Sequence, residues 1–126
     1  MFSFSTHPRY LAIFVLLTAV LVSGCNRSDT LQLKGRTLKV VLSEYRLHPQ
    51  TIHAKQGALT IAVRNEGDLP HDLAVGQKSI VLDRSTIIKH GQTAVIKVTV
   101  VPGTYRLYSS LANDDTLGLY GFLVVE

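Results

Sequence analysis

The sequence has only one cysteine and one methionine in 126 residues, and it has no tryptophan. A single cysteine, Cys25, excludes a disulfide within the chain and any metal site that needs several thiolates. Charges are also sparse: 13 Lys and Arg against 9 Asp and Glu give a net charge of +4. The basic residues form no block and no stripe interleaved with aromatic residues, so we expect no nucleic-acid partner.

The first part of the chain has the pattern of an export signal. Arg9 precedes a continuous apolar run over residues 11–22, which is typical of a secretory signal and too short to span a bilayer comfortably. The run ends in Val22-Ser23-Gly24-Cys25, which resembles the lipobox of bacterial lipoproteins, where the cysteine becomes the lipidated first residue. We therefore expect residues 1–24 to be a lipoprotein signal peptide and residues 25–36 to be the lipidated cysteine and a polar tether.

A lipid on Cys25 would place the protein at the cell membrane or the outer membrane, facing the periplasm or the extracellular side. Lipidation would also leave no thiol in the mature chain, and this excludes a cysteine-ligated metal. The alternative is an ordinary signal peptide followed by an unrelated cysteine.

Residues 37–126 carry short β-rich runs separated by turns, and no run has a sustained helical period. The phase of the alternation slips near Ser43, which predicts a bulge or kink there. About seven strands at this spacing predict an all-β domain, an antiparallel Greek-key β-sandwich. The positions predicted to form its core are Leu59, Ile61, Val63, Leu73, Val75, Ile96, Val98, Tyr105, Leu107, Leu123 and Val125.

Two stretches narrow the type of sandwich. "VRNEGDLPHDLAV" (Val63 to Val75) resembles the segment of cupredoxins, such as plastocyanin and azurin, in which an Asn-x-Gly turn leads to a metal-binding histidine. "VPGTYRLYS…GLYGFLVV" resembles the C-terminal hairpin of the same family, which carries the remaining ligands. The resemblance extends over nearly all of Leu38 to Glu126 and implies a cupredoxin-like fold.

The same resemblance implies which residues of this chain occupy the ligand positions of a copper site. A blue copper centre uses two histidines, a cysteine thiolate and a weak axial methionine. In this chain His71 takes the place of the first histidine, and Ser109 takes that of the cysteine. The second histidine position falls on Ala112 with close ligand spacing, or on Asp114 or Asp115 with longer spacing, and Leu119 takes the methionine position. We therefore expect a degenerate site and no cofactor.

Three functions remain to be distinguished. The favoured one is a non-redox binding or structural module that presents its loop end to a protein partner or small ligand. The second is a copper-binding electron-transfer or copper-handling protein that uses His71 with unconventional ligands, for which Asp114 and Asp115 are candidates. A hydrolase built on Ser109 or Ser110 is weaker, because the chain has no nucleophile elbow or glycine-rich oxyanion segment; we expect no enzyme activity.

Overall fold

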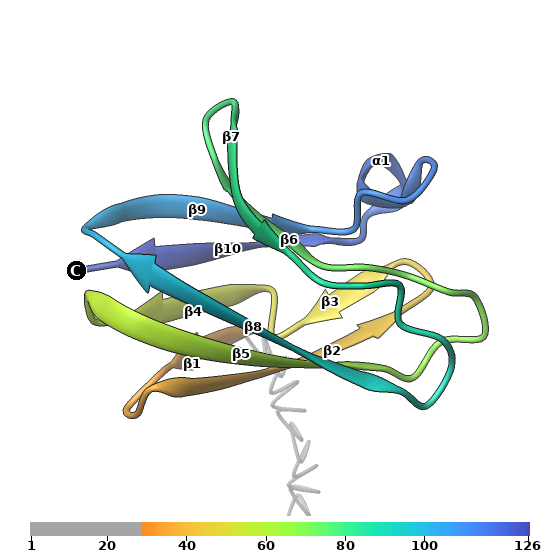
Figure 1. Ribbon diagram of the computed structural model, residues 1–126, viewed down its shortest axis with the longest axis horizontal. Helices are drawn as coiled ribbons and strands as arrows, with labels where there is room; N and C mark the ends of the chain where they lie inside the picture. Colours follow the sequence, from red (N-terminus) through yellow and green to blue (C-terminus); the bar gives the residue numbers. More distant parts are fainter. Residues whose placement is uncertain (1–28) are drawn as a thin grey trace, which may run out of the picture.

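The computed structural model describes residues 29–126 as a sandwich of two β-sheets. The six-stranded sheet has the order β1-β4-β10-β9-β6-β7, and the four-stranded sheet has the order β3-β2-β5-β8 (Figure 1). The elements are β1 (Thr30–Gln32), β2 (Thr37–Ser43), β3 (Arg46–His48), β4 (Thr51–Ala54), β5 (Gly57–Asn65), β6 (Ala74–Gln77), β7 (Ile80–Arg84), β8 (Thr93–Val100), β9 (Gly103–Tyr108), α1 (Asp114–Leu117) and β10 (Tyr120–Val125).

The all-β prediction is confirmed, but two of its details were wrong. The described chain has ten strands rather than about seven. The sheets are mixed rather than purely antiparallel, because β1 pairs with β4, β4 with β10, and β2 with β5 in parallel. Each parallel pair joins strands that are not consecutive in the chain, and local alternation does not encode such pairings.

The extra strands are short and lie where alternation is weak. β1 falls within the predicted tether, and all three of its residues are exposed at a sheet edge, so it carries no apolar alternation. The phase slip near Ser43 is a tight hairpin and not a bulge: β2 ends at Ser43, and β3 returns antiparallel to it with Leu42 opposite Leu47. Residues 1–28, including the predicted signal peptide and Cys25, lie outside the described part of the chain.

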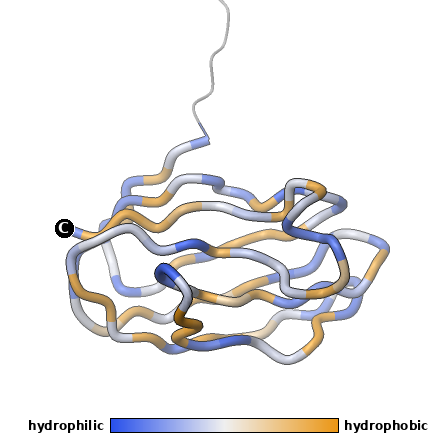
Figure 2. The backbone as a smooth tube through the Cα atoms, turned by 90° about the horizontal axis from the view of Figure 1, so that it is seen from above, coloured by the Kyte–Doolittle hydropathy of each residue, from blue (hydrophilic) through white to orange (hydrophobic). Residues whose placement is uncertain are grey.

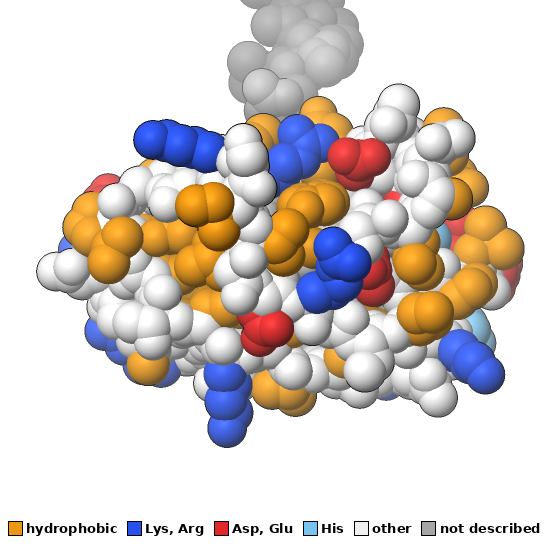
Figure 3. Space-filling model, turned by 45° about the horizontal axis from the view of Figure 1, so that its top comes forward, with side chains coloured by type: hydrophobic (Ala, Val, Ile, Leu, Met, Phe, Trp, Pro, Cys, Tyr) orange, Lys and Arg blue, Asp and Glu red, His pale blue; other side chains and the backbone are white. Residues whose placement is uncertain are grey.

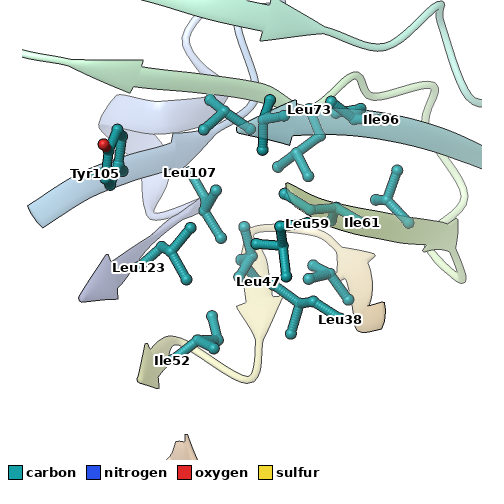
Figure 4. Close-up of a cluster of buried hydrophobic side chains, with 14 of the residues drawn as sticks. Leu38, Leu47, Ile52, Leu59, Ile61, Leu73, Ile96, Tyr105, Leu107 and Leu123 are labelled. Carbon is teal, nitrogen blue, oxygen red and sulfur yellow. The ribbon is translucent and has the colours of Figure 1, made fainter. Parts of the chain in front are cut away.

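Side chains from both sheets fill the interior. All eleven predicted core positions are buried, none more than 7% exposed, and Figure 4 shows several of them meeting between the sheets. The alternation that predicted them is visible along the tube in Figure 2, where hydrophobic and hydrophilic residues succeed one another. The hydroxyl of buried Tyr105 donates to the carbonyl of Val101 at 2.9 Å and accepts from the Val101 N–H at 3.0 Å, so this aromatic side chain fills the core with its polar atom satisfied.

The two ends of the sandwich differ. In Figure 1 the C-terminus lies at the left end, whereas helix α1 and the loops after β2 and β5 gather at the right end. This right-hand end, called the loop end below, carries the side chains that the sequence singled out. Within residues 29–126, no helix has the length and apolar character needed to cross a bilayer.

Candidate functional site

His71 is the centre of the loop end and is fully buried. Its backbone is fixed by a short bridge to Ile88, with His71 N–H donating to Ile88 O at 3.1 Å and Ile88 N–H donating to His71 O at 2.7 Å. Its ring lies between two carboxylates: Nδ1 is 2.7 Å from Oδ2 of Asp114, and Nε2 is 2.8 Å from Oε1 of Glu44. Both ring nitrogens therefore have a protein partner.

The chemistry of these contacts determines where the protons are. An ionised carboxylate can only accept hydrogen bonds, so each ring nitrogen that faces one must donate. Nε2 therefore donates to the ionised Glu44, and Nδ1 shares a hydrogen bond with a second carboxyl group, that of Asp114. The side-chain partners of His71 are therefore two carboxyl groups rather than backbone carbonyls or hydroxyls.

Glu44 joins three parts of the loop end. It lies in the turn between β2 and β3, and its carboxylate also accepts the N–H groups of Asp68 at 3.0 Å and Leu69 at 2.8 Å. Burial alone would raise the pKa of Glu44, but the hydrogen bonds from Leu69, His71 and Asp68 outweigh it and lower that pKa to about 2. The Glu44 carboxylate therefore stays ionised at every pH well above 2.

Gly67 makes room for this arrangement. A Cβ atom at Gly67 would lie only 2.6 Å from Oε2 of Glu44, so any side chain there would press on the carboxylate. The loop is held from the other side by buried Asn65, whose side-chain amide donates to Leu69 O at 2.7 Å and to Ile88 O at 2.8 Å, while its oxygen accepts from Gly67 N–H at 2.9 Å. The Asn-x-Gly turn that marked this segment in the sequence thus shapes the loop around His71.

The second half of the network runs from Asp114 to Ser110. The Ser109 hydroxyl lies 2.7 Å from Oδ2 of Asp114 and 3.1 Å from Oδ1 of Asp72, with its proton available to either. Oδ1 of Asp72 also accepts from the Ser110 N–H at 2.6 Å, and the Ser110 hydroxyl donates to the other oxygen of Asp72. One oxygen of Asp114 thus contacts both His71 and Ser109, which are the residues at the first-histidine and cysteine positions.

The other predicted positions do not join this network. Asp115, beside Asp114 in α1, is half-exposed and lies 3.7 Å from Arg106 on the adjoining sheet face. Ala112 is exposed, and Leu119 is buried in the hydrophobic core. Asp114 begins the short helix α1, and its side chain is buried.

Glu44 and Asp72 were not predicted from the sequence. Glu44 is 27 positions from His71, and nothing in its neighbourhood marks the turn that carries it over the ring. Asp72 directly follows His71, and an acid next to a predicted site residue was a signal that could have been used. The Glu44 contact joins segments of the two sheets, and the Asp72 contacts form beside the paired strands β6 and β9.

This set of residues does not fit a blue copper centre. Such a centre needs a thiolate, and residues 29–126 contain no cysteine. The imidazole that remains is already bonded at both nitrogens, and within the described residues no group of three or more His, Cys, Asp or Glu side chains could hold a metal ion. A serine triad is not formed either, since Ser109 contacts Asp114 and Asp72, and His71 contacts Asp114 and Glu44.

The fold and this site together define a cupredoxin-like domain with altered ligands. A family model described as "Cupredoxin-like domain" matches residues 11–125, and the chain belongs to that family. No curated protein sequence matches it.

Several solved structures are similar in fold. Reduced auracyanin from Roseiflexus castenholzii superimposes with a TM-score of 0.67 at 13% identity, over 73% of this chain and 98% of that one. Rusticyanin from Thiobacillus ferrooxidans gives a TM-score of 0.63 at 15% identity, over 78% and 82%. Auracyanin A from Chloroflexus aurantiacus, described as a "blue" copper protein, gives 0.64 at 16% identity, over 75% and 99%.

Proposed function

We propose that this protein is a membrane-anchored, extracytoplasmic cupredoxin-like lipoprotein that acts as a non-redox binding or structural module. The anchoring part rests on the sequence around Cys25, with its apolar run and small residues before a sole cysteine. Two acyl chains would hold the protein on the membrane far more firmly than one. Its loop end would be presented to a protein partner, and we assign no catalytic activity to it.

The observation that carries the non-redox part is the pairing of His71 with Asp114 and Glu44. A metal at this position would have to displace the Asp114 carboxylate from Nδ1. It would gain one imidazole and oxygen ligands, a set that suits copper poorly. The contacts of Glu44 and Asp114 with His71 tie the three loops of this end together.

A second candidate is a copper-binding electron-transfer or copper-handling protein. The similarity in fold to auracyanin A, itself described as a blue copper protein, favours it. It requires that His71, Asp114 and other oxygen ligands rearrange around the ion.

Titration of residues 26–126 with Cu(II) and Cu(I) separates the two candidates. We expect a colourless protein without stoichiometric copper, and the same result for His71→Ala and for Asp115→Asn. Tight one-to-one binding that His71→Ala abolishes and Asp115→Asn retains would establish the second candidate instead.

Membrane anchoring is tested in the full chain. Cys25→Ser should move the protein to the soluble fraction or stall its processing, whereas the wild type should resist salt extraction. If wild type and variant fractionate alike, the lipid anchor is wrong.

A further inference from the structure

The fold begins very close to the predicted lipid. Asp29, the first described residue, is already fixed: its carbonyl accepts from the Thr51 N–H at 2.9 Å, and its Oδ1 lies 2.6 Å from Nδ1 of His48. Only Asn26, Arg27 and Ser28 separate it from Cys25. A chain spans at most about 3.3–3.6 Å per residue, so the lipid-bearing residue can be no more than roughly 14 Å from Asp29. This length holds the domain against the bilayer.

Such a short connection selects which edge of the sandwich is near the membrane. β1 directly follows Asp29 and is the edge strand of the six-stranded sheet. β7 is the opposite edge, five strand spacings away, or roughly 24 Å at about 4.8 Å per spacing. Figure 1 shows the two strands at the bottom and the top of the domain. The lipid can thus hold β1 at the membrane surface while β7 stays away from the membrane.

The β1 edge carries three basic side chains. Leu33 N–H donates to His53 O at 2.8 Å, which places the adjoining Lys34 beside the end of β4. Arg36 reaches the same place, since its Nη1 donates to the carbonyls of Lys55 and Gln56 at 3.1 and 2.8 Å. The Lys55 side chain is 76% exposed, and its ammonium lies 3.6 Å from one local acid, Glu126.

We propose that this basic edge, with Lys34, Arg36 and Lys55, rests on the anionic lipid headgroups of the membrane that holds Cys25. The proposal depends on the lipid anchor of the proposed function. A Lys or Arg near an anionic bilayer contributes about 1 kcal/mol, within a Debye length of the surface. On the face drawn in Figure 3 the basic side chains are dispersed among side chains of other types.

The exposed apolar residues of β7 offer the rival orientation. Ile80, Val81 and Leu82 are 70%, 44% and 40% exposed, and in another protein such a patch could enter a bilayer. Here the tether leaves from the far edge of the sheet. The proposal therefore places these three side chains away from the membrane, where a protein partner can reach them.

Depth-dependent quenching distinguishes the two orientations in the full-length lipoprotein. Because Cys25 is the only native cysteine and its sulfur carries the lipid, a fluorophore can be attached to Gln32→Cys on β1 or to Ser79→Cys beside β7, both exposed positions. The protein is reconstituted into phosphatidylcholine–phosphatidylglycerol vesicles that contain a lipid spin-labelled on its headgroup. We expect quenching to be several-fold stronger at position 32 than at position 79.

Charge reversal tests the headgroup contact. Lys34→Glu with Lys55→Glu should lower quenching at position 32 to the level seen in pure phosphatidylcholine, while Lys78→Glu with Lys89→Glu, which changes net charge equally, should leave it unchanged. Equal quenching at positions 32 and 79, or stronger quenching at 79, overturns the proposed orientation even when the protein floats with the vesicles. Equal effects of the two charge reversals overturn the role of the basic edge. If the wild type does not float with the vesicles, the lipid anchor and this inference both fail.

Discussion

One oxygen of Asp114 lies 2.7 Å from Nδ1 of His71, and both side chains are buried at the loop end of the sandwich. The same oxygen lies 2.7 Å from the hydroxyl of Ser109. A carboxylate therefore occupies the place between the residues at the first-histidine and cysteine positions. The Asp114 carboxyl group thus joins the imidazole of His71 to the hydroxyl of Ser109.

Removing the charge of Asp114 should therefore be costly. Breaking a buried ion pair leaves its partner uncompensated, and this typically costs about 3–5 kcal/mol. We expect Asp114→Asn to lower the free energy of unfolding by about that amount, measured by urea denaturation.

The matched control is Asp115→Asn, which changes the next residue in the same helix. Asp115 is half-exposed and 3.7 Å from Arg106, so its removal should cost under about 1 kcal/mol. Equal losses in the two variants would show that the pairing of Asp114 with His71 does not stabilise the fold.

Glu44 should make stability depend on acid pH. Its pKa falls from an ordinary value of 4.5 to about 2 on folding, so the unfolded chain takes up its proton first as the pH drops. The stability that Glu44 contributes is complete above pH 4.5 and is lost as the pH falls from there towards 2. Glu44→Gln should lower stability at neutral pH and flatten the decline between these two values.

Glu66→Gln is the control for this pH dependence. Glu66 is an exposed acid that lies 3.5 Å from Arg64 on the surface, and its loss should leave the acid decline as in the wild type. A Glu44→Gln variant whose stability falls as steeply as the wild type between pH 4.5 and 2 would contradict the role assigned to Glu44.

The sequence predicted what depends on local alternation. Leu59, Ile61 and Val63 alternate along β5 because one face of that strand is buried, and the structure places all three in the core. The sequence also singled out His71, because a histidine after an Asn-x-Gly turn resembles a copper ligand of the cupredoxins. Neither inference needed knowledge of the assembled sheets.

What could not be predicted depends on contacts between distant segments. Glu44 meets His71 only after the β2–β3 hairpin folds over the loop that follows β5, and a lone acid in a turn has no period to mark it. The strand β1 was missed for a related reason: its three residues are exposed, so pairing with β4 is its only structural role, and pairing leaves no hydrophobic signature.

Gly121 offers a test of how closely the two sheets pack. A Cβ there would lie 2.9 Å from a methyl carbon of Leu47 in the opposite sheet and 2.5 Å from the carbonyl oxygen of Gln50. Backbone cannot yield as a flexible side chain can, so the strands would have to separate. We expect Gly121→Ala to cost roughly 1–3 kcal/mol by thermal or urea unfolding, as overpacking does.

Gly35→Ala is the matched control for this packing test. A Cβ at Gly35 meets nothing within 4 Å, so the substitution should leave stability within about 1 kcal/mol of the wild type. If both glycine variants are equally stable, the sheets are more loosely packed at β10 than the structure has them.

The position of Asp114 against both His71 and Ser109 predicts that a copper site can be rebuilt. Ser109→Cys supplies a thiolate, and Asp114→His replaces the carboxylate with a second imidazole, so three nitrogen and sulfur ligands would converge where the ion pair now lies. Such ligands suit copper. We expect the double variant of residues 26–126 to bind Cu(II) one-to-one and to show a visible thiolate-to-copper absorption band. Adding His71→Ala should abolish the band.

The control for the rebuilt site moves both substitutions by one residue. Ser110→Cys with Asp115→His introduces the same two side chains, but Asp115 faces Arg106 on the sheet surface and not His71. This variant should take up copper weakly and without the band. Colour in the shifted variant, or none in Ser109→Cys with Asp114→His, would mean that residues 71, 109 and 114 do not converge as a ligand set requires. In that case the ion pair of His71 and Asp114 would be a feature of this loop alone rather than the replacement of a metal.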